Sequence, residues 1–139
     1  MNNWLFLAFL SIGAISCAHA QSTETVVPGV KTTPGVVTNI SVDQLAAALA
    51  ADSSIHVLDV RSIQEYVGGH IANAKQIDIL QNEHFKEEIQ KLDKNHTYWV
   101  YCRSGHRSLI AADEMIRAGF TSVINVEGGF NAWSARKKE

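Results

Sequence analysis

The sequence is poor in cysteine, with only Cys17 and Cys102 among 139 residues. No CxxC pair occurs, which excludes the dithiol chemistry of thioredoxin-like redox proteins. Because Cys17 lies in a segment with the features of a cleaved leader, Cys102 is expected to be the sole thiol of the mature chain. It then has no partner for an internal structural disulfide. Such a cysteine is either buried and inert or a reactive thiol.

Basic charge is also scarce. Twelve Lys and Arg residues stand against 14 Asp and Glu residues, a net charge of −2, so we expect no broad basic surface and no nucleic-acid partner. The six histidines are scattered, and no pair has the close spacing of metal ligands, so we expect no metal site. With 46% apolar and 19% charged residues, the chain has the composition of an ordinary globular protein of one domain.

A long hydrophobic run is missing too. The apolar run over residues 4–15 is too short to span a membrane comfortably, so we expect no membrane span in the mature chain. The first 20 residues carry no charged side chain and end in Ala-His-Ala, a pattern typical of signal-peptide cleavage. We therefore predict a signal peptide over 1–20 and export of the protein, to the periplasm if the source is bacterial.

The first 35 residues also bear on anchoring and on where the domain begins. Residues 14–17, Ala-Ile-Ser-Cys, loosely resemble a lipoprotein box, so lipidation of Cys17 is one alternative to simple secretion, and an uncleaved anchor is another. The segment 21–35 holds both prolines together with Gly, Thr and Ser, which predicts a flexible linker or tail. The folded domain is then expected over 36–139.

Strand and helix patterns alternate along that domain. Branched and aromatic runs predict strands, and apolar residues spaced by three and four predict amphipathic helices between them. The expected strands are 36–40, 55–60, 74–79, 97–101 and 122–126, and the expected helices begin at 42, 81, near 108 and near 128. The alternation predicts an α/β domain, with a central, mostly parallel sheet of four to five strands flanked by helices.

The loop that follows the strand 97–101 concentrates reactive chemistry. Cys102 comes directly after the strand, at the sheet edge where sites of α/β proteins form. Gly105 permits a tight turn of inward-facing N–H groups, and the next helix, expected near Ser108, adds its positive dipole end. With Arg103 and Arg107 beside it, the thiol is expected to have a lowered pKa and to act as a nucleophile.

Other uses of Cys102 compete with this interpretation. The thiol would be a small buried hydrophobic group if the two arginines were plain surface charges. A cysteine hydrolase would need a histidine base, for which His70 and His106 are the candidates, although nothing in the sequence places either one.

Four segments give the region from about Ile40 to Trp133 a specific resemblance to single-domain rhodaneses, which are sulfurtransferases. They are LDVRSIQEY (58–66), GGHIANA (68–74), YCRSGHRS (101–108) and VEGGFNAW (126–133). The third is similar to the active-site loop of that family. The second departs from the family pattern, because Asn73 stands where a glycine is usual.

The resemblance implies a mechanism without a cofactor. Cys102 would take the outer sulfur of a small anionic donor such as thiosulfate, form a persulfide, and pass the sulfur to cyanide, a thiol or a protein. Backbone N–H groups of the loop would cradle the persulfide. The substrate-binding residues it implies are Arg103, Ser104, Gly105, His106 and Arg107. Nothing in the sequence suggests a large exposed apolar face, so a monomer is expected.

The length of the loop distinguishes sulfur transfer from phosphate or arsenate chemistry. Relatives on the same fold that act on phosphate or arsenate have a C-x5-R loop, whereas Cys102 and Arg107 are spaced as C-x4-R. The smaller ring suits a sulfur atom better than a tetrahedral oxyanion. A phosphate or arsenate enzyme therefore stays a distant alternative. A sulfur-carrier or interaction module, whose own turnover is incidental, is the nearer one.

The remaining polar and aromatic residues of the matching segments have mainly structural interpretations. We expect structural contacts from Asp59, Arg61, Glu65 and His70, with a minor possibility that Arg61 binds the anion, and core packing from Trp99, Phe130 and Trp133. His106 either contacts substrate or is merely exposed, and Arg107 faces either the anion or a salt-bridge partner. Ser108 is a candidate N-cap of the following helix.

Overall fold

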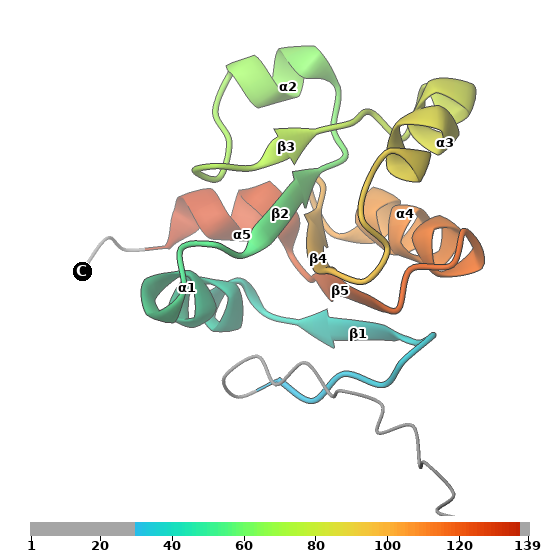
Figure 1. The fold of residues 1–139 in the computed structure, drawn as a ribbon. Helices are drawn as coiled ribbons and strands as arrows, with labels where there is room; N and C mark the ends of the chain where they lie inside the picture. The colour runs from blue at the N-terminus through green and yellow to red at the C-terminus, as the bar shows by residue number, and fades with distance from the viewer. Residues whose placement is uncertain (1–29, 137–139) are drawn as a thin grey trace, which may run out of the picture.

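The computed structural model describes residues 30–136, and strands alternate with helices throughout that range (Figure 1). The strands are β1 (Val37–Ile40), β2 (His56–Asp59), β3 (Lys75–Gln76), β4 (Thr97–Tyr101) and β5 (Ser122–Val126). The helices are α1 (Val42–Ala51), α2 (Ile63–Val67), α3 (Asn82–Gln90), α4 (His106–Arg117) and α5 (Gly129–Ala135). The α/β class expected from the alternation is confirmed.

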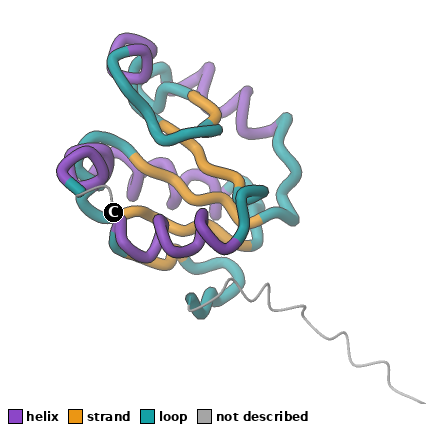
Figure 2. The backbone as a smooth tube through the Cα atoms, turned by 90° about the vertical axis from the view of Figure 1, so that its left-hand side faces the viewer, coloured by secondary structure: helices purple, strands orange, loops and turns teal. Residues whose placement is uncertain are grey.

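All five strands form one sheet in the order β1-β5-β4-β2-β3, and every pair is parallel. Figure 2 shows the strands as one continuous layer among the helices. Parallel neighbours place all their carboxyl ends at one edge of the sheet. Since β4 lies in the middle, the loop that leaves it starts at the centre of that edge.

Helices cover both faces of the sheet because side chains alternate along each strand. Trp99 and Tyr101 belong to the core on the α1 and α5 side, whereas Tyr98 and Val100 belong to the core beneath α3 and α4. Three residues of α4, among them Ala111, pack in that second core. Figure 1 shows the two helix pairs on opposite sides of the sheet.

Three local features differ from the sequence-based expectation. The helix expected near Ser108 begins two residues earlier, at His106, because Gly105 turns the chain through a left-handed conformation and is itself the N-cap. The strand expected over 74–79 is only Lys75–Gln76. The short helix α2 was not predicted, although Ser62 and Glu65 form a complete capping box at its start.

The N-terminal predictions fall largely outside the described residues. The signal peptide over 1–20 and Cys17 lie there entirely, as does most of the expected linker. Within the described part of that linker, Val30 is buried in the core on the α1 side, and the Gly35 N–H donates to the carbonyl of Thr121. Packing therefore extends upstream of residue 36. No helix in 30–136 is long and apolar enough to cross a membrane.

Candidate active site

Cys102 lies at the carboxyl end of the central strand, directly after Tyr101. Its side chain is buried, with 1% of the residue exposed, in the core beneath α3 and α4. Burial alone suits an inert thiol as well as a reactive one. The polar groups that surround the sulfur decide between these two interpretations.

The loop from Cys102 turns back over its own sulfur. The backbone N–H of Gly105 donates to Cys102 Sγ at 3.1 Å, and the hydroxyl of Ser108 lies 3.5 Å from the same atom. Gly105 has φ +104, and a Cβ there would lie 3.3 Å from the backbone nitrogen of Gly128. The turn thus needs glycine for both its conformation and its space.

These donors lower the pKa of the Cys102 thiol below its ordinary value. Burial opposes this by raising the pKa, but hydrogen bonds from the Ser108 side chain and from the backbone N–H groups of Ser108, Gly105 and Ser104 outweigh it. The direction agrees with the sequence-based expectation. The backbone N–H groups were part of that expectation, whereas the hydrogen bond from the Ser108 side chain was not, and neither arginine donates a hydrogen bond to the sulfur.

The start of α5 fixes the other side of the loop. The backbone N–H groups of Phe130 and Asn131 donate to the carbonyl oxygens of Cys102 at 2.8 Å and of Arg103 at 3.0 Å. These two hydrogen bonds turn the carbonyls toward α5 and fix the position of the loop. Gly129 permits the approach, since a Cβ there would lie 2.8 Å from the Arg103 carbonyl and closer still to that of Cys102. The Gly-Gly pair at the start of α5 is therefore needed for the position of the loop.

Ser108 is buried and continues into a chain of polar side chains. Its hydroxyl lies 2.7 Å from Asn125 Oδ1 on β5, and Asn125 Nδ2 donates to Asn39 Oδ1 on β1 at 2.9 Å. Asn39 and Asn125 are register partners on adjacent strands. The expectation that Ser108 caps the helix is wrong, because Gly105 is the N-cap and Ser108 lies inside α4.

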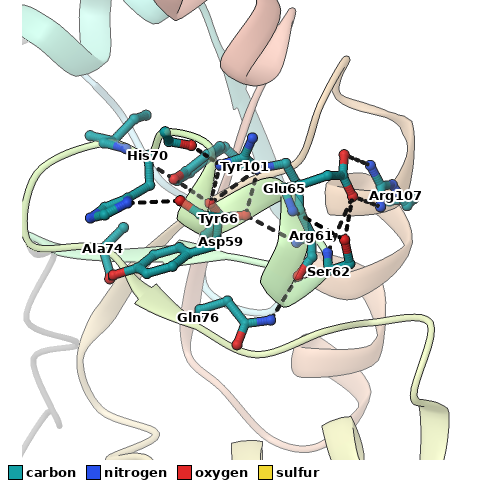
Figure 3. Close-up of polar contacts among 12 residues, drawn as sticks. Asp59, Arg61, Ser62, Glu65, Tyr66, His70, Ala74, Gln76, Tyr101 and Arg107 are labelled. Atoms are coloured by element: carbon teal, nitrogen blue, oxygen red, sulfur yellow. Dashed lines mark hydrogen bonds and ion pairs between the residues drawn. The ribbon is translucent and has the colours of Figure 1, made fainter.

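The two loop arginines differ in their surroundings. Arg107 donates to both carboxylate oxygens of Glu65 on α2, at 2.8 and 2.9 Å, and this ion pair lowers the pKa of Glu65 to about 2 (Figure 3). The structure thus places Arg107 in the salt bridge that was one of its two expected roles. Arg103 and His106 are exposed, and neither side chain has a polar partner among residues 30–136.

A buried ion pair between Asp59 and Arg61 lies at the end of β2, the strand next to β4. Arg61 donates to both oxygens of Asp59 (Figure 3) and to the carbonyl of Gly69. Its guanidinium lies 4.3 Å from the centre of the Phe130 ring. The Tyr101 hydroxyl donates to Asp59, and burial raises the pKa of that phenol. With Arg61 only 3% exposed, its structural interpretation is favoured over anion binding.

His70 and the three aromatic residues of the matching segments make structural contacts. The Nδ1 of His70 lies 3.0 Å from the carbonyl of Tyr66, and the two rings are stacked. Trp99 is buried in the core, against which Phe130 and Trp133 pack. Among residues 30–136, no group of three or more histidine, cysteine or acidic side chains is arranged to hold a metal ion.

Two contributors to the site were missed in the sequence. Asn125 is the only polar side chain within the apolar run VINV, and that contrast was the available signal. Gly129 was recognised only as part of a motif, although its close approach to the loop explains why the motif contains it. Pairing of β1 with β5, which brings Asn39 to Asn125, could not be deduced from local patterns.

Known proteins are similar to this chain in sequence. Thiosulfate sulfurtransferase 18 of Arabidopsis thaliana is 35% identical over 105 residues, which cover 68% of this chain and 77% of that protein. The putative sulfur carrier protein YrkF of Bacillus subtilis is 34% identical over 97 residues, 70% of this chain. This chain spans about half, 51%, of the length of that relative.

Solved structures and a family description agree. The crystal structure of a rhodanese-like domain protein from Staphylococcus aureus superposes with a TM-score of 0.60 at 31% identity, covering 69% of this chain and 90% of that one. Residues 41–136 match the family described as "Rhodanese-like domain", and they contain all four segments of the expected resemblance. The chain therefore belongs to the rhodanese-like domain family.

Proposed function

We propose that this protein is a sulfurtransferase that carries sulfane sulfur on Cys102, with thiosulfate or a related small anion as donor. The observation that carries the proposal is the buried Cys102 sulfur, which receives hydrogen bonds from the loop and lies at the carboxyl end of the central strand. Relatives named as sulfurtransferases and as a sulfur carrier support the same chemistry.

The reaction divides into two displacements. The Cys102 thiolate attacks the outer sulfur of thiosulfate, a new S–S bond forms, and the old S–S bond breaks with its electron pair leaving on sulfite. The resulting persulfide anion is then attacked at its outer sulfur by cyanide or a thiolate, which takes that sulfur and returns the Cys102 thiolate. Loop N–H groups that already bind the sulfur would stabilise both anions.

Two arginines in the loop, Arg103 and Arg107, favour a doubly charged donor such as thiosulfate. Arg107 is engaged by Glu65, whereas the exposed Arg103 side chain has no partner within 30–136. We propose that Arg103 supplies the mobile charge for the incoming anion, and that Ser104, Gly105, His106 and Arg107 form the rest of the substrate site. Arg107 then contributes through the shape of the loop and its positive field.

A direct measurement of sulfur uptake tests the function. The intact mass of the protein after exposure to thiosulfate should increase by one sulfur atom, and cyanide should remove that increase with formation of thiocyanate. Cys102→Ser should abolish both the mass gain and the release of sulfite. Sulfite release by Cys102→Ser at the wild-type rate would refute the proposal.

A second candidate role is that of a sulfur carrier, favoured by the similarity to the putative sulfur carrier protein of Bacillus subtilis. The persulfide would then form but pass only to a partner protein. Cyanide and small thiols would discharge it slowly, while the partner would discharge it fast. A phosphate or arsenate enzyme would instead hydrolyse phosphate esters or reduce arsenate, and neither activity is expected.

We propose further that the protein is exported and acts as a monomer in a bacterial periplasm. The uncharged apolar leader with Ala-His-Ala at 18–20 supports export. The intact mass of protein recovered from the native host decides the leader: loss of residues 1–20 supports cleavage, and a diacylglycerol adduct on Cys17 supports the lipoprotein alternative. Sedimentation would test the monomer.

A further inference from the structure

The Ser108 hydroxyl has more acceptors than it can serve. Three acceptors lie within reach of its oxygen: Asn125 Oδ1 at 2.7 Å, the Gly105 carbonyl at 3.1 Å and Cys102 Sγ at 3.5 Å. A hydroxyl carries one hydrogen and can donate fully to one acceptor at a time. The shortest of the three distances belongs to Asn125, so the amide competes with the sulfur for this hydrogen.

The orientation of the Asn125 amide decides that competition. In the structure its carbonyl oxygen faces Ser108 and its amino group donates to Asn39 Oδ1 at 2.9 Å. Turned by half a rotation, the amide would present its amino group to Ser108, and the hydroxyl hydrogen would be free for the sulfur. Asn39 therefore holds Asn125 in the orientation that draws the hydrogen away from Cys102.

The two amides differ in their exposure. Asn125 is 3% exposed, whereas Asn39 is an exposed residue on the edge strand β1. A polar path thus runs from a surface residue on the edge strand, along the α4 side of the sheet, to the reacting sulfur, with each step within hydrogen-bond distance. The contact between Ser108 and Asn125 is buried. It therefore affects the sulfur strongly, because hydrogen bonds within a low-dielectric core are not readily replaced by water.

We propose that Asn125, held by Asn39, is a positioning residue that sets the direction of the Ser108 hydroxyl hydrogen and so limits the hydrogen bonding available to the Cys102 sulfur. The proposal rests on the proposed function in taking Cys102 as the reacting group. It adds that thiolate formation is restrained by residues of the two strands β5 and β1. A weaker donor set keeps the sulfur more nucleophilic when it does ionise, since nucleophilicity falls with the pKa of the thiol.

Charged groups near the site come from several elements and must stay the same in the test. They are Arg107 on α4, Glu65 on α2, Asp78 after β3, the Asp59–Arg61 pair at the end of β2, Arg103 and His106 in the loop, and Glu127 after β5. Neither Asn39 nor Asn125 is ionisable. Replacing either by an apolar residue therefore changes the hydrogen bonding of Ser108 without changing this set of charges.

Titration of the thiolate by its ultraviolet absorbance tests the proposal on the full-length protein. The signal of Cys102→Ser is subtracted, which removes any contribution of Cys17. Asn125→Leu keeps a side chain of similar size and removes the competing oxygen. We expect its Cys102 midpoint to lie about half to one pH unit below that of the wild type, the size expected for one hydrogen bond gained by the thiolate.

Asn39→Ala provides a variant that leaves the core untouched. It frees the Asn125 amide to turn, so we expect a smaller decrease of the midpoint in the same direction. Asn39→Asp keeps the acceptor, because a carboxylate can only accept and holds the amide as in the wild type. The negative charge that it adds also disfavours a thiolate. Its midpoint should be at or above the wild-type value.

The outcomes are distinct. A midpoint that rises in Asn125→Leu, or stays unchanged in Asn39→Ala, overturns the proposal. The titration needs no sulfur donor, so its result is independent of the mass-gain experiment. A thiolate midpoint that moves as expected in a protein that takes up no sulfur would refute the function and keep the positioning role.

Discussion

Asn73 is the residue whose backbone most clearly departs from the usual range for its type. It has φ +62 and is the only residue other than glycine with positive φ among those described. Its side chain is exposed, and the residue lies within the turn that is closed by the Ala74 N–H donating to the Ile71 carbonyl. Asparagine tolerates this left-handed conformation better than most residues, which explains how it replaces the glycine usual in the family.

Substitutions at this position should therefore rank by backbone preference. Asn73→Gly is expected to keep or slightly increase the free energy of unfolding, whereas Asn73→Val is expected to lower it by about 1–2 kcal/mol. Urea denaturation measures both. Ala72→Val, at an exposed neighbour without positive φ, is the matched control and should cost much less. Equal losses from valine at both positions would contradict the explanation.

At the scale of elements, the entry into α5 determines the geometry of the loop after β4. The Phe130 and Asn131 N–H groups bind the carbonyls of Cys102 and Arg103, and Gly129 leaves the space for that contact. Two segments that are far apart in the sequence thus share one backbone arrangement. The Gly-Gly pair of the segment 126–133 is explained by this contact rather than by any chemistry of side chains.

Gly129→Ala should damage both stability and activity. The added Cβ would overlap the carbonyls of Cys102 and Arg103, so the loop or the helix must shift. We expect a loss of at least about 2 kcal/mol in the free energy of unfolding. A displaced loop should slow sulfur uptake by about a hundredfold, the cost of misplacing reacting groups by an ångström. The rate of sulfite release, measured on the folded fraction, reports the second effect.

A second glycine to alanine exchange serves as control for that prediction. A Cβ on Gly68, the C-cap of α2, would meet its nearest atoms at 3.5 Å, an ordinary contact. Gly68→Ala should therefore leave sulfite release near the wild-type rate. If it slows the reaction as much as Gly129→Ala does, the contact with the loop is not the cause.

For the whole molecule, local sequence patterns predicted most of the architecture. Branched and aromatic runs located β1, β2, β4 and β5, and the serine and glutamine at 41 and 44, which form a capping box, mark the start of α1. The strand expected over 74–79 is present only at Lys75–Gln76. These patterns involve only a few neighbouring residues, so they can be recognised without knowledge of the fold. The same holds for Cys102, whose place after the TYWVY strand follows from the strand itself.

Contacts between distant segments were not predictable in the same way. The partner of Arg107 is Glu65, 42 positions away on a helix that periodicity did not reveal, because α2 has only five residues. A helix of five residues is too short to show the hydrophobic periodicity by which helices are recognised in a sequence. The Asn39 to Asn125 contact joins positions 86 apart and depends on the order of strands in the sheet.

The Glu65–Arg107 pair connects α2 to α4 and should appear in the pH dependence of global stability. Glu65 is 29% and Arg107 22% exposed, so the pair is partly screened by solvent. The bidentate contact with Arg107 lowers the pKa of Glu65 to about 2, well below its unfolded value of about 4.3. A lowered folded pKa stabilises the protein above the unfolded pKa, and this contribution is lost as the pH falls from about 4.3 through about 2.

Glu65→Gln isolates this charge, because glutamine can still complete the capping box with Ser62. At pH 7 we expect the variant to unfold with a free energy about 1–2 kcal/mol lower than the wild type, after allowance for screening. That difference should shrink steadily between pH 4.3 and 2, where the wild-type carboxylate takes up its proton. Glu83→Gln removes an exposed carboxylate 3.7 Å from Lys86 and should have almost no effect on stability at pH 7. A difference between Glu65→Gln and the wild type that stays constant over this interval would mean that Arg107 is held by packing, and that its charge contributes little to joining the two helices.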